Sequence, residues 1–189
     1  NTEIYISRSG YTGEDGFEIS ISNENAQNFI NKVFKNKNTL LCGLGCRDSL
    51  RVEAGLSLYG NEINEDITPI QANLSWAIDK KRLDDENLNG SNILLQQLQE
   101  TKDTVKIGIT PVNKTMLRNN MTLHNMEKNE IGYITSGCFS PTLKRSIGIG
   151  YINNFTNKLD KLFVKVRGEF EEVIIDNIPF VKKNYKKGG

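Results

Sequence analysis

The hydrophobic positions of this chain change their period a little beyond its midpoint. In the earlier part, alternating runs at residues 3–7 and 17–22 predict two strands, because successive strand side chains point to opposite faces. Apolar residues then recur every three or four positions, which predicts an amphipathic helix over residues 23–36 with Asn23 as its N-cap. This part of the chain therefore mixes strands and helices.

Three further elements are predicted before the change of period. Residues 45–55 predict a short helix that stops at Gly55, and residues 91–100 predict another, with its leucines and isoleucine buried on one side. The apolar run at residues 74–78 predicts a buried strand that holds Trp76, the single tryptophan.

Beyond about residue 102 the helical spacing disappears, and short strands separated by turn residues replace it. The predicted strands are residues 105–112, 121–123, 130–136, 146–152, 161–166 and 169–175. Short strands at such intervals are typical of a small antiparallel barrel or sandwich. We therefore expect an α+β chain, with a mixed domain over residues 1–103 and a small antiparallel β barrel over residues 104–189.

A glycine-rich stretch connects the first two predicted strands. Residues 7–18 read Ser-Arg-Ser-Gly-Tyr-Thr-Gly-Glu-Asp-Gly-Phe-Glu, with a glycine at every third position from Gly10 to Gly16. Turns collect such residues, so composition alone favours a surface loop over a binding site by roughly two to one.

Composition narrows the classes of function. The net charge of +1 gives no field that would attract nucleic acid or a membrane surface, and no run approaches the roughly 20 apolar residues of a membrane helix. The three cysteines lack a framework spacing and there is one histidine, so we expect small buried free thiols in a reducing compartment and no metal site.

Four segments, taken in order, resemble the aminomethyltransferase of the glycine cleavage system, the T-protein. They are S-R-S-G-Y-T-G-E-D-G-F-E (7–18), C-G-L-G-C-R-D-S-L-R-V-E-A-G (42–55), L-Y-G with D-I-T-P and L-S-W-A (58–77), and I-G-Y-I-T-S-G-C-F-S-P-T-L-K (131–144). P-F-V and N-Y near residues 179–185 continue the resemblance. It spans almost the whole chain and implies the C-terminal half of that protein.

The resemblance implies an enzyme that takes an aminomethyl group from the lipoyl arm of the H-protein, passes the one-carbon unit to tetrahydrofolate and releases ammonia. It also implies three domains around a central folate pocket, the last a small β barrel. The family's catalytic aspartate belongs to the N-terminal half, so we expect no catalytic residue here and no turnover by this fragment alone. The location implied is the mitochondrial matrix in a eukaryote or the cytoplasm in a bacterium.

The resemblance also implies which residues bind folate. Glu18 matches a glutamate that contacts the pterin, whose amino group and ring N–H are two adjacent donors suited to one carboxylate. Arg47 matches an arginine that would bond the pterin carbonyl or the glutamyl carboxylate. Tyr11 and Tyr185 match tyrosines of the same pocket. Without the resemblance, Glu18 would be interpreted as an outward-facing acid on a strand and Arg47 as an arginine on a helix surface. Tyr11 would be an aromatic residue of a loop, and Tyr185 a residue of the C-terminal tail.

Arg118 and the loop at residues 135–141 are weaker candidates, with Gly137 and Pro141 interpreted first as turn formers. Two alternatives stay open. One is the folate domain of a sarcosine or dimethylglycine dehydrogenase, and the other is a non-catalytic folate-binding relative.

Overall fold

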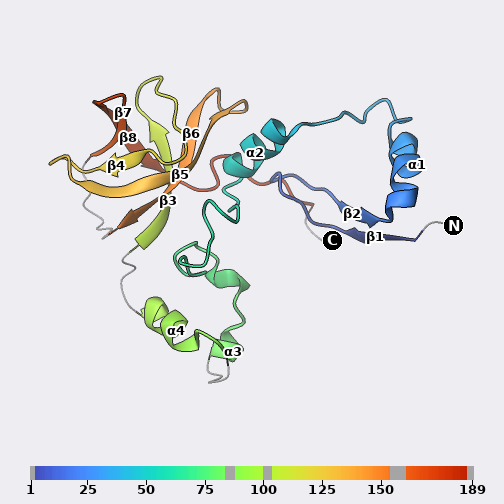
Figure 1. Cartoon of the computed structure of the whole chain (residues 1–189), viewed down its shortest axis with the longest axis horizontal. Coiled ribbons are helices and arrows are strands. Elements are labelled where there is room, and N and C mark those ends of the chain that lie inside the picture. Colours follow the sequence, from blue (N-terminus) through green and yellow to red (C-terminus); the bar gives the residue numbers. More distant parts are fainter. Residues whose placement is uncertain (1–2, 84–87, 100–103, 154–160, 187–189) are drawn as a thin grey trace.

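The computed structural model describes residues 3–83, 88–99, 104–153 and 161–186 of the 189-residue chain. Figure 1 shows a β barrel at one end, a hairpin with a helix at the other, and helix α2 between them. The elements before the barrel are β1 (Ile4–Ser7), β2 (Glu18–Ile21), α1 (Asn23–Val33), α2 (Leu44–Glu53), η1 (Ser75–Ala77), α3 (Lys80–Leu83) and α4 (Ser91–Gln99). The predicted α+β class is confirmed.

The six later strands form a closed antiparallel barrel. They are β3 (Thr104–Pro111), β4 (Thr122–His124), β5 (Glu130–Ser140), β6 (Arg145–Asn153), β7 (Leu162–Val166) and β8 (Glu169–Asp176). Their order is β3-β6-β5-β4-β7-β8, and β8 pairs with β3 to close the sheet. The barrel core contains Ile107, Ile109, Leu117, Leu123, Ile134, Ile152, Leu162, Val164 and Val173. Because the sheet is closed, none of its six strands has an open edge. Of the two architectures that the sequence predicted, a barrel or a sandwich, the structure has the barrel.

Helix α2 packs against the outside of the barrel. Val52 is fully buried against Ile147 and Ile149 of β6, a burial that typically contributes about 1.5–3 kcal/mol. The helix ends as predicted at Gly55, which has φ +68°. Gly55 N–H donates to the Val52 carbonyl (2.9 Å) and Leu56 N–H to the Arg51 carbonyl (2.8 Å), the bond pair that closes a helix through a left-handed residue.

The first two strands form a separate antiparallel hairpin, in register from Ile4–Ile21 to Ser7–Glu18, and α1 follows it. The N-cap of α1 is Ser22 rather than the predicted Asn23, which lies inside the helix. The apolar face of α1 exists as the period predicts, but much of it is exposed: Ile30, Val33 and Phe34 are 43 %, 37 % and 40 % exposed.

Two predictions in the helical segment before the barrel are wrong. Trp76 does not lie in a buried strand; it lies in the short 3₁₀ helix η1 and is 80 % exposed. A five-residue apolar run is too short for its period to distinguish a strand from a helical turn. In α4, Ile93 and Leu98 are exposed rather than buried. The predicted last residue of that helix, Glu100, and the domain boundary near residue 103 lie outside the described residues, so the boundary stays a prediction.

Gly137 is not a turn former. It lies within β5, where a Cβ atom would overlap the backbone of Leu117 and Arg118. Glycine is needed there because the segment before β4 crosses the strand at close range. Pro141 does lie in the β5–β6 turn, in which Lys144 N–H donates to the Ser140 carbonyl (2.8 Å).

The three cysteines are free thiols, as predicted, but two of them are not buried. Cys42, just before α2, and Cys46, in its first turn, are exposed, whereas Cys138 on β5 is partly buried. Burial raises the pKa of Cys138 to about 11. Cysteine is among the most often buried residue types, which is why burial was expected. The segment before α2 is exposed in this structure, and no helix or strand among the described residues packs over it.

Candidate functional site

The chain's last described segment returns from the barrel to the glycine-rich stretch. Val181 N–H donates to the Glu53 carbonyl at the end of α2 (3.0 Å), and Asn184 N–H donates to the Gly13 carbonyl (2.8 Å). These bonds place Tyr185, 44 % exposed, in a cleft of about 300 Å³ that Gly10 and Gly16 also line. A residue that sequence position alone assigned to the tail is therefore held beside the stretch that carries Tyr11 and Glu18.

Tyr11 and Arg47 are brought together from positions 36 residues apart in the sequence. The Arg47 guanidinium carbon lies 4.7 Å from the centre of the Tyr11 ring, a cation–π contact. The Tyr11 hydroxyl donates to the Ser57 carbonyl (2.7 Å), and partial burial raises the pKa of Tyr11. The ring is thus fixed at its hydroxyl end and covered by an exposed arginine on α2.

Glu18 lies at the start of β2, opposite Ser7, with its side chain exposed. It accepts a hydrogen bond from the Ser9 hydroxyl and has no ion pair among the residues that the structure describes. A carboxylate has about four acceptor positions, so this one keeps the capacity to accept two adjacent donors.

Arg118 is not part of this grouping. It is exposed in the segment before β4, and its backbone N–H donates to the Met121 sulfur (3.4 Å). Within the described ranges, no hydrogen bond, ion pair or ring contact joins Arg118 to Tyr11, Glu18 or Tyr185. The weaker sequence candidate therefore lies on the barrel, apart from the contact between Tyr11 and Arg47.

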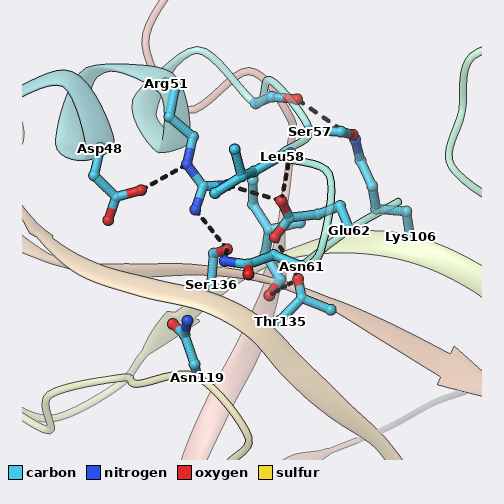
Figure 2. A network of polar contacts seen from close by, with 12 residues as sticks. Asp48, Arg51, Ser57, Leu58, Asn61, Glu62, Lys106, Asn119, Thr135 and Ser136 are labelled. Atoms are coloured by element: carbon cyan, nitrogen blue, oxygen red, sulfur yellow. Dashed lines mark hydrogen bonds and ion pairs between the residues drawn. The ribbon is translucent and has the colours of Figure 1, made fainter. Parts of the chain in front are cut away.

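Sequence analysis missed a polar network centred on the buried side chains of Arg51 and Glu62 (Figure 2). Arg51, one turn further along α2, is 1 % exposed. Its guanidinium donates to Asp48 Oδ1 (2.8 Å), Glu62 Oε2 (2.8 Å) and Ser136 Oγ on β5 (2.6 Å). Arg47 and Arg51 lie one turn apart on α2, and their spacing in the sequence carries no signal for which of them meets the barrel.

Glu62 is the other centre of this network and is fully buried. Besides Arg51, its carboxylate accepts from Leu58 N–H (2.9 Å) and the Thr135 hydroxyl (2.6 Å). Its backbone carbonyl accepts from the Tyr151 hydroxyl (2.7 Å), whose pKa burial raises. The loop that contains Ser57, which holds Tyr11, is therefore bound to the barrel at several points.

Two features are absent from the described ranges. No group of three or more His, Cys, Asp or Glu side chains there is arranged to hold a metal ion. No helix in the same ranges combines the length and apolarity needed to cross a membrane.

The chain thus has two parts, a hairpin with helices followed by a closed six-stranded barrel, and both parts match known families. The model of the GCVT N-terminal domain matches residues 1–82, and that of the glycine cleavage T-protein C-terminal barrel domain matches residues 102–182. The chain belongs to the aminomethyltransferase, or T-protein, family of the glycine cleavage system, as the resemblance predicted.

Named relatives agree along nearly the whole chain. The mitochondrial aminomethyltransferase of Flaveria trinervia is 39 % identical over 98 % of this chain and 46 % of its own length. The human mitochondrial enzyme is 38 % identical over 95 % of this chain and 45 % of its own. The crystal structure of aminomethyltransferase T from Bartonella henselae matches with TM-score 0.91 and 36 % identity, over 97 % of this chain and 51 % of that one. The chain spans about half the length of the curated relatives it matches.

Proposed function

We propose that this chain forms the folate-recognising portion of a tetrahydrofolate-dependent aminomethyltransferase of the glycine cleavage system. That enzyme would move the one-carbon unit from the aminomethyl-lipoyl arm of the H-protein to tetrahydrofolate and release ammonia. The support is family membership over nearly all of the chain, together with relatives that are named aminomethyltransferases. The names of these relatives also describe them as mitochondrial, which supports a location of this protein in the mitochondrial matrix.

The single observation that carries the proposal is the contact between Arg47 and Tyr11. Both residues were assigned to one pocket from separate motifs, and the guanidinium lies 4.7 Å from the ring centre. An aromatic ring with a planar cation beside it suits a flat heterocycle with a carbonyl acceptor. Glu18 would supply the complementary acceptor for the pterin's amino group and ring N–H.

The role of these residues is to bind and orient rather than to react covalently. Glu18 would hold the pterin edge, Arg47 an acceptor oxygen of the folate, and Tyr11 and Tyr185 the walls of the pocket. Holding the folate amine against the aminomethyl carbon converts a bimolecular step into an effectively unimolecular one. We assign no proton-transfer role to any aspartate of this chain.

A chimera tests the proposal. This chain would replace the portion that it matches in the Bartonella henselae aminomethyltransferase, and aminomethyl transfer from H-protein to tetrahydrofolate would be followed as ammonia release. The expected result is measurable transfer, with kcat/KM reduced at least about 100-fold by Glu18→Gln, because a charge-assisted pair of hydrogen bonds is lost. A soluble chimera without transfer activity would reject the proposal. Oxidation of sarcosine or dimethylglycine supported by the chimera would favour the dehydrogenase alternative.

A further inference from the structure

A second cavity lies next to the Tyr11 wall, between the end of α2, η1, β3 and the C-terminal segment. Its volume is about 180 Å³, and its lining includes Ser57, Trp76, Lys106 and Lys183. Ser57 links this cavity to the proposed folate site, because its carbonyl accepts from Tyr11 while its hydroxyl faces Lys106.

Lys106 is the unusual group in this cavity. It lies on β3 with only 6 % of its surface exposed, and its ammonium donates to Ser57 Oγ (2.7 Å) and to the Gly55 carbonyl (3.5 Å). No ion pair among the described residues includes it. An ammonium group carries three donors, and burying one without a partner carboxylate is costly.

The electrostatic surroundings of Lys106 leave positive charge in the cavity. Desolvation, opposed by the negative charge of Glu62 and reinforced by the positive charges of Lys183 and Arg51, lowers the pKa of Lys106 to about 8. At neutral pH the group is still charged. An anion in the cavity would therefore relieve both the burial cost and the repulsion from Lys183.

Lys183 is held in place by the segment that carries it. The neighbouring bonds from Val181 to Glu53 and from Asn184 to Gly13 fix the backbone on both sides. Leu74, Trp76, Ile178 and Pro179 supply apolar walls to the same cavity. Two cations with apolar walls suit a charged head group on a short hydrocarbon stem.

We propose that this cavity binds the carboxylate group of a small organic anion between the ammonium groups of Lys106 and Lys183. The carboxylate could come from a free short-chain dicarboxylate or from the glutamyl end of a folate. Only the second source rests on the proposed function.

The single tryptophan makes the binding directly observable. Trp76 lines the cavity, so the full chain would be titrated with glutarate at pH 7 while Trp76 fluorescence is recorded, with uncharged glutaramide as the matched ligand. We expect a saturable change with glutarate and none with glutaramide. An equal response to both, or no saturable response to glutarate, would overturn the proposal.

Three variants locate the site. Lys106→Met and Lys183→Met should each weaken glutarate binding at least tenfold, whereas Lys182→Met, which removes the same charge from a side chain lining a different cavity, should change it less than twofold. Circular dichroism verifies folding, and the exposed Lys183 keeps the test decisive if Lys106→Met does not fold. Unchanged affinity in Lys183→Met, or an equal loss in Lys182→Met, would contradict the site.

Competition identifies the source of the carboxylate. Displacement of glutarate by a reduced folate but not by a pterin without its glutamyl tail would assign the site to the folate tail. Absence of displacement, with glutarate binding intact, would assign it to a free dicarboxylate. Because glutarate binding is measured without folate, failure of the folate proposal leaves this test unaffected.

Discussion

Arg51 and Glu62 form an ion pair that is sealed from solvent, with 2.8 Å between Nη1 and Oε2 and side chains 1 % and 0 % exposed. The pair joins α2 to the loop that follows it, and bonds to Ser136 and Thr135 join both to β5. The proposed ligand-binding residues Tyr11 and Arg47 are therefore supported from behind by a single network.

Removing Arg51 should strongly destabilise the chain. Arg51→Met leaves the Glu62 carboxylate buried without its cation, which typically costs about 3–5 kcal/mol. Urea unfolding would measure the loss. The double variant with Glu62→Gln should recover part of it, since no buried charge remains. Arg8→Met, which breaks the exposed pair with Asp15, should leave the midpoint nearly unchanged. Equal midpoints for Arg51→Met and wild type would refute the role of the pair.

Tyr11 should contribute through its ring more than through its hydroxyl. Tyr11→Phe removes the hydrogen bond to the Ser57 carbonyl and should cost about 1 kcal/mol of stability, with folate affinity reduced only a few fold. Tyr11→Ala also removes the surface that Arg47 covers, and should weaken folate binding more than tenfold. The reverse order of the two variants in a calorimetric titration would show that the ring does not contact the ligand.

Lys106 should make stability rise with pH in the alkaline range. The folded chain releases this proton near pH 8, whereas the ordinary value is 10.5. Between these values the unfolded state binds more protons, so the free energy of unfolding increases with pH, by up to about 3 kcal/mol from this group.

The comparison with Lys106→Met isolates that effect, because other titrating groups such as Cys138 act in both proteins. The stability difference between wild type and variant should shift in favour of wild type between pH 8 and 10.5. Lys182→Met should run parallel to wild type. A pH-independent difference for Lys106→Met would mean that Lys106 titrates normally.

Gly55 should tolerate no side chain. Its φ of +68° disfavours any other residue, and a Cβ atom would overlap the Ile178 side chain. Gly55→Ala should therefore cost at least about 2 kcal/mol. Gly16→Ala is the matched control, because nothing lies within 4 Å of a Cβ atom there. Thermal unfolding of both variants measures the contrast, and similar midpoints would argue against the helix-end geometry.

The barrel was predictable because each of its strands is visible in the local sequence pattern. Alternating residues such as Ile107 and Ile109 point into one core, and turn residues separate each strand from the next. Trp76 was misplaced because its apolar run is too short to show a period. The exposure of Ile30 and Phe34 on α1 was not predictable, because periodicity reports that a face is apolar and not what covers it.

The candidate site was predictable only as separate residues. Motifs singled out Tyr11, Glu18 and Arg47, but the contact between Tyr11 and Arg47 depends on how the glycine-rich stretch folds over α2. Burial of Arg51 and Lys106 depends on how α2 and the loop that follows it pack against the barrel, and local sequence does not report such long-range contacts. The folate-binding roles of Tyr11, Glu18, Arg47 and Tyr185 are proposals.

The most direct test of the account is the folate affinity of the chimera with the Bartonella henselae protein, measured by calorimetry with a stable reduced folate. Glu18→Gln and Arg47→Met should each weaken binding at least tenfold while circular dichroism stays unchanged. The matched controls Glu127→Gln and Arg82→Met, both on exposed side chains, should bind as the parent chimera does. Folded Glu18→Gln and Arg47→Met variants with unaltered affinity would contradict the assignment of folate recognition to these residues.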